Sequence, residues 1–208
     1  MAEKNGISPR REPRQQRARA RIDAILNATA ELMEEHDFSR LTTNLVARRA
    51  GVNIASIYQY FSNKNAIITA LAERILAEYR EALSDFPEKI ASTEDWRPVI
   101  NCGLTRLLEV ALRQKGLESL RRAMSADPRL AAVAEGHDRA VAGIFAEGLR
   151  RRKTSLSETQ AMAIAETLVR SSRFLYLSNG PLFGEKDLTL VGEVFKMQYA
   201  YLANYLDR

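Results

Sequence analysis

Side chains able to form hydrogen bonds with nucleic acid gather in one short segment, residues 54–60. The Gln59 amide can bond to the edge of a base or to a phosphate, and the hydroxyls of Tyr58 and Tyr60 can bind phosphate oxygens. The small Ala55 near the start of the segment lets the backbone approach a base edge, and its methyl group can touch that of thymine. This combination of residue types predicts a surface that reads DNA.

Two further residues extend this surface on either side. Ile54 can also touch a thymine methyl group. Lys64 stands where the first turn of a following helix is expected, and free backbone N–H groups at such a position already favour an anion. A phosphate of the DNA backbone is the expected partner of Lys64.

The sequence contains no motif typical of an enzyme or of a metal site. The histidines, His36 and His137, are far apart, and the single cysteine, Cys102, adds no metal-ligand spacing. No glycine-rich phosphate loop and no nucleophile elbow occurs. We therefore expect neither catalysis nor a metal ion nor a cofactor.

The elements that must position the DNA-reading segment are two short helices joined by a glycine turn. Thr42 is placed to cap a helix over residues 43–50, and Asn53 is placed to cap a second helix over residues 54–61. Gly51 lies between them, where only glycine enters a left-handed conformation at low cost. In such a pair the first helix braces against the DNA backbone while the second lies in the major groove. The spacing therefore predicts a helix-turn-helix unit.

Helical periodicity extends over the rest of the chain, and strand patterns are nearly absent. Apolar residues at three- and four-residue steps predict a first helix from Arg17 to His36 and a fourth, long helix over residues 64–83. Five further helices are expected after residue 95. Their boundaries are set by a break at Gly116, the Asp127–Pro128 cap, the Ser157–Gln160 capping box and the Asn179–Pro181 stop. An all-α fold of about nine helices follows.

The composition is that of a globular protein with an excess of positive charge. Hydrophobic residues make up 46% of the 208 residues, enough for a core without disulfides, and the net charge of +5 suits a polyanionic partner. No apolar stretch is long enough to span a membrane, and no apolar signal region follows the first charges, so we expect a cytoplasmic protein. The lone Cys102 is expected to be a small core side chain.

The first residues of the chain are strongly basic. Residues 1–21 carry two acidic side chains, Glu3 and Glu12, against a larger basic set: Lys4, Arg10, Arg11, Arg14, Arg17, Arg19 and Arg21. Two interpretations stay open, an arm that wraps phosphates or enters a minor groove, and a solvated tail without regular structure.

The segment from Leu41 to Lys64 resembles the DNA-binding domain of the TetR family of bacterial repressors, and the resemblance extends over roughly residues 17–71. Its signature is long and free of gaps: Thr43, Ala47, Ala50–Gly51–Val52, Ile57–Tyr58, Tyr60–Phe61 and Lys64. The family often has glycine at the position of Ala55 and a polar residue at that of Ile54. These departures keep the fold and leave open which bases are read.

The resemblance implies a set of DNA contacts that includes the residues chosen above. The set is Thr43, Asn44, Asn53, Ile54, Ala55, Ser56, Tyr58, Gln59, Tyr60 and Lys64. For Tyr58 and Tyr60 the alternative role is core packing. Ile57 and Phe61 are expected in the core and are not proposed as contacts.

The resemblance also divides the chain into a basic disordered arm (1–16), a helix-turn-helix DNA-binding domain (17–63) and a regulatory domain (64–208). The last two helices, about residues 157–178 and 186–206, would pair with those of a second subunit in a four-helix bundle. A homodimer of this kind reads a palindromic operator, because it presents two recognition helices about one DNA turn apart.

A small, hydrophobic effector is implied as well, bound among the fourth to eighth helices and releasing the repressor from its operator. The candidate pocket residues are Tyr79, Trp96, Leu104, Leu108, Met124, His137, Phe145, Arg173 and Phe174. The apolar members could equally be plain core, and His137 could be a hydrogen-bonded core histidine. Arg173 could anchor an anionic ligand or form a salt bridge between subunits.

Two other functions stay open at this point. The chain could be an activator, because that outcome depends on where the binding site lies relative to a promoter. It could also be a helical ligand-sensing or scaffolding protein with a degenerate DNA-binding module. The intact signature and the basic first segment favour a working DNA-binding module.

Overall fold

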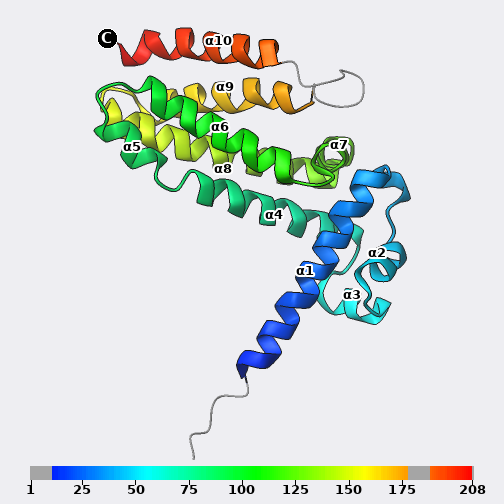
Figure 1. Cartoon of the computed structure of the whole chain (residues 1–208). Coiled ribbons are helices and arrows are strands. Elements are labelled where there is room, and N and C mark those ends of the chain that lie inside the picture. Colours follow the sequence, from blue (N-terminus) through cyan, green and yellow to red (C-terminus); the bar gives the residue numbers. More distant parts are fainter. Residues whose placement is uncertain (1–10, 178–187, 208) are drawn as a thin grey trace, which may run out of the picture.

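The computed structural model describes residues 11–177 and 188–207, and the regular elements in these ranges are all helices, which confirms the predicted fold class (Figure 1). The predicted stop at Asn179–Pro181 lies outside the described residues. None of the described helices combines the length and the apolar composition needed to cross a membrane. The elements are α1 (Arg11–Glu35), the 3-10 helix η1 (Phe38–Arg40), α2 (Thr43–Ala50), α3 (Ile54–Tyr60), α4 (Lys64–Ala82), α5 (Phe86–Ser92), α6 (Arg97–Arg113), α7 (Leu117–Ala126), α8 (Pro128–Arg152), α9 (Glu158–Leu177) and α10 (Leu188–Leu206).

The helices form two parts that share α4. The N-terminal part consists of α1, α2, α3 and the start of α4, and the remaining helices are stacked in layers beside it (Figure 1). α8 lies at the centre of the larger part, where it packs against α4, α5, α7 and α9. α7 lies next to the N-terminal part and contacts both α1 and η1. The two parts therefore meet through α4 and through α7.

α1 begins earlier than its predicted start at Arg17. Residues 11–16, expected to belong to a basic disordered arm, form the first turns of the helix, and residues 1–10 lie outside the described part of the chain. Figure 1 shows this end of α1 projecting away from the other helices. The arginines at 17, 19 and 21 are exposed on it. From Arg11 onward, where the structure describes the chain, the positive charge is thus carried on a helix.

Helix boundaries that depend on local caps lie where the sequence predicts them. The side chain of Thr42 accepts a hydrogen bond at the start of α2, that of Asn63 at the start of α4, and that of Asp127 at the start of α8. The capping box of α9 forms in full, because the Gln160 N–H donates to Ser157 Oγ at 3.2 Å and the Ser157 N–H donates to Gln160 Oε1 at 3.1 Å.

The short helix α5 has no counterpart among the predicted helices, because Pro87 indicates a terminator when only its neighbours in sequence are considered. In the fold Pro87 stands in the first turn of α5, where proline is tolerated. Phe86 is buried between α6 and α8, where two glycines leave room for its ring. A Cβ atom at Gly103 would lie 3.0 Å from the Phe86 ring, and one at Gly148 would lie 2.9 Å from it. Packing between distant segments, rather than a local signal, explains α5.

Cys102 is not in the core, where the sequence analysis places it. Its side chain is exposed on α6, whereas the next two residues, Gly103 and Leu104, are buried. The helix turns by about 100° per residue, so a neighbour of buried residues can still face solvent. The prediction that Cys102 fills the core was wrong.

Candidate nucleic-acid interface

The turn between α2 and α3 has the geometry that its sequence predicts. Gly51 adopts φ 65° and ψ 29°, in the left-handed region. Its N–H donates to the Arg48 carbonyl at 3.3 Å, and the Val52 N–H donates to the Ala47 carbonyl at 3.0 Å. A side chain at Gly51 would meet open space, so the backbone conformation alone selects glycine here.

Apolar contacts fix how α3 lies against α2. Ile57 and Val46 are fully buried, and Ala47 and Phe61 are nearly so. These side chains belong to a core that continues into α1 and α4. The predictions that Ile57 and Phe61 are core residues are confirmed. Because one face of α3 is held in this core, the opposite face is fixed toward solvent.

The outward face of α3 presents Ala55, Tyr58 and Gln59, which we call the reading face. These residues are three and four positions apart and therefore lie on one side of the helix. All of them are exposed, and the Tyr58 side chain is 57% accessible, so core packing is not its role. The reading face offers a methyl group, a hydroxyl and an amide to a single partner surface.

α2 adds one polar side chain beside the reading face and a second one nearby in sequence. The Thr43 hydroxyl and the Tyr58 hydroxyl lie 3.1 Å apart and share a hydrogen bond. Asn44 follows Thr43 at the exposed start of α2. The fold thus brings Thr43 and the reading face together from two helices.

The remaining predicted contacts on α3 also contribute to the fold itself. The side chain of Asn53 caps the helix by accepting a hydrogen bond from the Ala55 N–H at 2.9 Å. Ile54 and Tyr60 are half-buried and pack against the core, and Ser56 is half-buried as well. All four stay predicted contacts, and the half-buried Ile54, Ser56 and Tyr60 offer a partner less surface than the reading face does.

Lys64 lies at the first turn of α4, as predicted. Its ammonium group is 4.2 Å from the centroid of the Phe38 ring, a cation–π contact that orients the side chain. Both residues border an open groove of about 630 Å³ that continues to α7 and the start of α8. The contact between Lys64 and a phosphate stays a prediction.

An ion pair fastens α2 to α1. The Arg49 guanidinium donates to both carboxylate oxygens of Glu35, at 2.8 Å and 2.7 Å, and it also lies 3.7 Å from the carboxylate of Glu31. The hydrogen bond from Arg49 lowers the pKa of the Glu35 carboxyl group. A bidentate pair fixes orientation as well as charge, so it aligns α2 on the last turn of α1.

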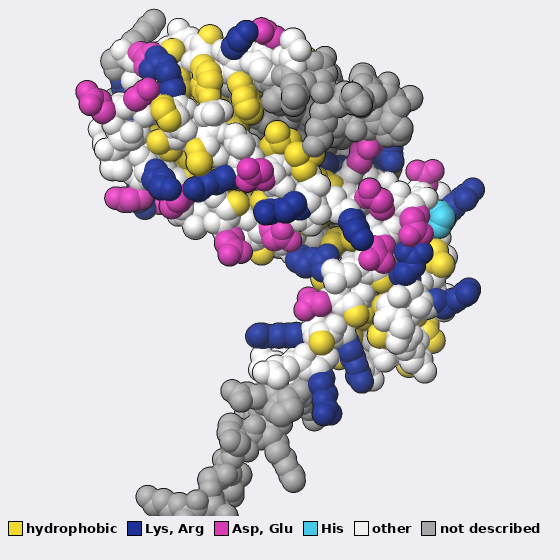
Figure 2. All heavy atoms as spheres, viewed as in Figure 1, with side chains coloured by type: hydrophobic (Ala, Val, Ile, Leu, Met, Phe, Trp, Pro, Cys, Tyr) yellow, Lys and Arg dark blue, Asp and Glu magenta, His cyan; other side chains and the backbone are white. Residues whose placement is uncertain are grey.

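Positive charge follows the projecting end of α1. Figure 2 shows mainly basic side chains along this part of the helix, whereas basic and acidic side chains are mixed over the larger part of the molecule. The exposed Arg17, Arg19 and Arg21 belong to this stretch. The N-terminal part therefore presents both a polar helix face and a basic helix.

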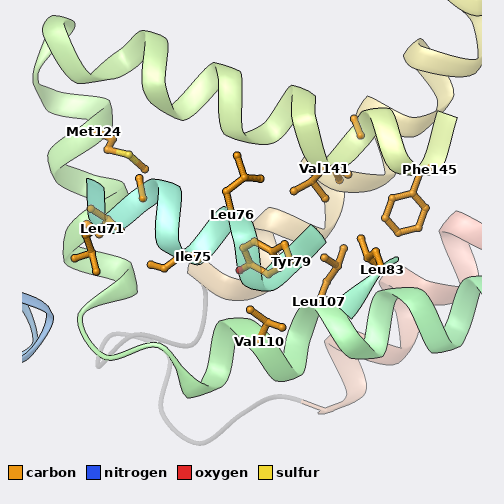
Figure 3. Close-up of a cluster of buried hydrophobic side chains, with 14 of the residues drawn as sticks. Leu71, Ile75, Leu76, Tyr79, Leu83, Leu107, Val110, Met124, Val141 and Phe145 are labelled. Atoms are coloured by element: carbon orange, nitrogen blue, oxygen red, sulfur yellow. The ribbon is translucent and has the colours of Figure 1, made fainter. Parts of the chain in front are cut away.

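The larger part of the molecule holds a half-buried polar cluster at the edge of its core. Two small cavities, each of about 20 Å³, lie on either side of Arg121, His137 and Asp138, which line both. The Tyr79 ring meets the His137 ring edge-on, with 5.4 Å between their centroids. Burial raises the pKa of the Tyr79 hydroxyl, and the charge of Arg121 offsets part of that rise. Figure 3 shows Tyr79 on α4 among apolar side chains of α6 and α8.

Only some of the predicted pocket residues meet at these cavities. Tyr79, Met124 and His137 line them, whereas Leu104 and Phe145 are buried in the core. Leu108 is half-buried on α6. The side chains of Arg173 and Phe174 lie outside the described residues.

Trp96 lies away from the other predicted pocket residues, at the start of α6. Its indole N–H donates to the Asp207 carboxylate at 2.7 Å, and its ring contacts that of Tyr199 at 6.2 Å between centroids. Arg97 pairs with the same carboxylate. Trp96 thus connects the start of α6 to α10 and to Asp207, the residue that follows α10.

Arg121 is the cavity residue that the sequence-based interpretation missed most clearly. It lies on α7 between Leu117 and Met124, on the side of the helix that also carries Leu120. A single charged residue within an apolar stripe was the available signal. Leu107 on α6 was missed as well, because it resembles any other core leucine.

The fold and the reading face define a helix-turn-helix protein with a larger helical domain attached. The family model described as bacterial regulatory proteins, tetR family, matches residues 25–71, which run from the second half of α1 through the first turns of α4. This part of the chain is therefore similar to the DNA-binding region of TetR-family regulators.

Curated relatives match mainly the N-terminal region. An HTH-type transcriptional repressor of Mycobacterium tuberculosis is 27% identical over 93 residues, which are 45% of this chain and 34% of the relative. The tetracycline repressor protein class A of Escherichia coli is 39% identical over 56 residues, which are 27% of this chain and 26% of the relative. The chain thus spans about a third of these relatives or less.

Solved structures resemble the chain over nearly its full length. A TetR-family transcriptional regulator from Streptomyces coelicolor is 25% identical with a TM-score of 0.67, and the match covers 91% of this chain and 99% of that one. SmeT of Stenotrophomonas maltophilia, in a complex with triclosan, shares the fold with a TM-score of 0.60 at 19% identity, over 88% of this chain and 91% of its own. The larger helical domain therefore has the same fold as those of known regulators.

Proposed function

We propose that the chain is a sequence-specific DNA-binding transcriptional regulator that reads the major groove with α3. The observation that carries this proposal is the reading face, held outward by the Gly51 turn and by the buried Ile57 on the opposite side of the helix. In this geometry the Gln59 amide bonds to a base edge and the Tyr58 hydroxyl to a phosphate. Repression is the favoured outcome, because the relatives of Mycobacterium tuberculosis and Escherichia coli are named as repressors.

The basic end of α1 binds the phosphate backbone of the same DNA. Because residues 11–21 are helical, their width of about 10–12 Å exceeds the minor-groove width of about 6 Å, which argues against insertion into that groove. The exposed Arg17, Arg19 and Arg21 then lie along the phosphates beside the site read by α3. DNA binding of this kind also implies that the protein works in the cytoplasm, where a bacterial chromosome lies.

A homodimer through α9 and α10 doubles this reading unit. The two helices pack together, and Gln198 on α10 is buried against α9, where its amide N–H donates to the Leu168 carbonyl at 3.1 Å. Met197, the preceding residue of α10, is 54% exposed and offers an apolar side chain to a second subunit. Two subunits present two copies of α3, which fits a palindromic operator with half-sites about 34 Å apart.

A small hydrophobic effector binds at the cavities around Arg121 and His137 and weakens operator binding. The named complex of SmeT with triclosan supports a small-molecule site in this fold. α4 starts beside the reading unit at Lys64 and carries Tyr79 at the cavity, so movement of α4 changes the spacing of two recognition helices. A hundredfold loss of operator affinity requires a coupling free energy of about 2.7 kcal/mol.

The test is selection of bound duplexes from a random library by the full chain, followed by sequencing and footprinting. We expect an inverted repeat with half-sites about one DNA turn apart. Selection with Gln59→Ala should give a changed base preference at one position of each half-site, whereas Arg80→Ala, an exposed change on α4, should leave the selected sequence as it was. Recovery of unrelated sequences by the unmodified chain would contradict the proposal.

A further inference from the structure

The last turn of α1 is contacted from both parts of the molecule. Three acidic residues, Glu31, Glu34 and Glu35, lie on this turn, and we call them the acidic turn. Arg49 reaches it from α2, and Lys115 and Gly116 reach it from the connection between α6 and α7. The acidic turn is therefore a direct link between the helix-turn-helix unit and the larger domain.

On the side of the reading unit, Arg49 forms the bidentate pair with Glu35 and extends to Glu31 at 3.7 Å. Arg49 lies in the last turn of α2, directly before the Gly51 turn that positions α3. A shift of the acidic turn is thus transmitted to α3 through one ion pair and one short helix.

On the side of the larger domain, the contact is a tight backbone fit. The Gly116 N–H donates to the Glu34 carboxylate. The Lys115 ammonium group lies 3.5 Å from the Glu31 carboxylate. A Cβ atom at Gly116 would lie 2.5 Å from the Ala30 carbonyl oxygen and 2.8 Å from Met33 Cβ. The absence of a side chain at 116 therefore lets the α6–α7 connection rest directly on α1.

α7, which starts immediately after Gly116, is well placed to respond to an effector. Leu117, Arg121 and Met124 of this helix line the small cavity that also borders α4 and α8. At its far end Asp127 accepts a hydrogen bond from the Asn65 side chain of α4 at 3.1 Å. A ligand that enlarges the cavity pushes on α7 as well as on α4 and α8, and both ends of α7 are attached to the N-terminal part.

We propose that the acidic turn of α1 couples α7 to α2 and α3 as a second route of regulation, separate from the movement of α4. Glu31 is the shared element, because its two oxygens face Arg49 and Lys115. The residues of this route are positioning residues: they act on the reading face through Arg49 and do not touch DNA. The inference rests on the proposed function for its biological meaning, whereas the coupling itself is a property of the free protein.

The experiment is amide hydrogen exchange on the full chain, read by mass spectrometry in two windows, residues 43–50 and residues 117–126. Arg49→Gln breaks the route from the side of the reading unit, and Arg48→Gln removes the same charge from the neighbouring exposed position. Lys115→Gln breaks it from the other side, with Arg113→Gln as its matched control. Lys115→Arg restores the charge.

Arg49→Gln should speed exchange in window 117–126, and Lys115→Gln should speed exchange in window 43–50, each by about 1.5- to 5-fold, because single exposed ion pairs contribute modest free energies. The two controls and Lys115→Arg should leave the distant window unchanged. Equal exchange in variant and control would overturn the proposal.

The same exchange experiment on the DNA-bound protein separates this inference from the proposed function. A selected duplex should slow exchange in window 117–126 of the unmodified chain, and Lys115→Gln should reduce that effect, because coupling between sites is reciprocal. Failure to select any duplex would remove the proposed function, whereas the coupling would still be tested by exchange in the free protein. A duplex that binds with sequence preference but leaves window 117–126 unchanged would overturn the coupling and keep the function.

Discussion

The N-terminal part and the larger domain are stabilised in different ways. In the reading unit, short helices begin at side-chain caps and meet at a glycine turn, so each boundary depends on neighbours a few residues away. In the larger domain, helices such as α5 exist because distant segments pack on them, as Phe86 does between Gly103 and Gly148. The difference teaches that local signals determine where this protein presents its reading face, whereas long-range packing determines the arrangement of helices in the larger domain.

The largest expected effect contrasts a core side chain of the larger domain with an exposed one of the reading face. Phe145→Ala should lower the free energy of unfolding by about 3–5 kcal/mol, because the ring is fully buried against Phe86, with 4.5 Å between centroids. Tyr58→Ala should change it by less than about 0.5 kcal/mol, because that side chain is mostly exposed. Denaturant titration measures both, and comparable losses would break the contrast.

The two left-handed glycines sharpen the comparison, because their φ angles are nearly equal, 65° at Gly51 and 64° at Gly116. Gly51→Ala should cost about 1–2 kcal/mol from backbone strain alone, since its side chain would meet open space. Gly116→Ala should cost more, because the added methyl group would also collide with the Ala30 carbonyl. Thermal unfolding of the two variants tests this order, and equal losses would show that the contact with α1 is loose.

A smaller effect is expected from the cap of α3. Asn53→Ala should lower the free energy of unfolding by about 1 kcal/mol, because the Ala55 N–H loses its acceptor. Asn53→Ser keeps an acceptor at the same position and should retain most of the stability. If the alanine variant were as stable as the serine variant, the cap would not contribute, and Asn53 would be left with DNA contact alone.

The smallest expected effect concerns Asp85 in the larger domain and depends on pH. Hydrogen bonds from Lys89 and Arg106 lower the pKa of Asp85 from 3.8 to about 2. A pKa lowered in the folded state contributes stability that is present above about pH 4 and is lost as the pH falls toward 2. Because Asp85 is partly exposed, Asp85→Asn should cost less than about 1 kcal/mol at pH 7.

The measurement is unfolding of Asp85→Asn and of the unmodified chain at several pH values. The difference between them should shrink as the pH approaches 2, because the unmodified carboxylate becomes protonated there. Asp23→Asn, an exposed change on α1, is the matched control. A difference that persists unchanged at low pH would assign the effect of Asp85 to something other than its charge.

The sequence predicts the reading unit well for a physical reason. Thr42, Asn53 and Gly51 act through hydrogen bonds and φ preferences that involve only their neighbours, so their residue types are enough to place α2 and α3. Arg49 was less predictable, because its partner Glu35 lies on another helix and the pairing depends on how α1 and α2 meet.

The larger domain was predictable in class but not in detail. Periodicity indicates which residues face a core, and Leu104, Met124 and Phe145 are indeed buried. It does not indicate which of them surround a cavity, because that depends on several helices at once. Trp96 therefore lies with Asp207 rather than with Tyr79, and Cys102 faces solvent.

Competitive binding of the full chain to a selected duplex, with a scrambled duplex of equal length as competitor, tests the central claim most directly. If the reading face contacts base edges, the selected duplex should bind at least about a thousandfold more tightly at physiological salt, and both affinities should fall as salt rises. Equal affinity for the two duplexes at every salt concentration would contradict the claim, because charge alone would then account for all binding.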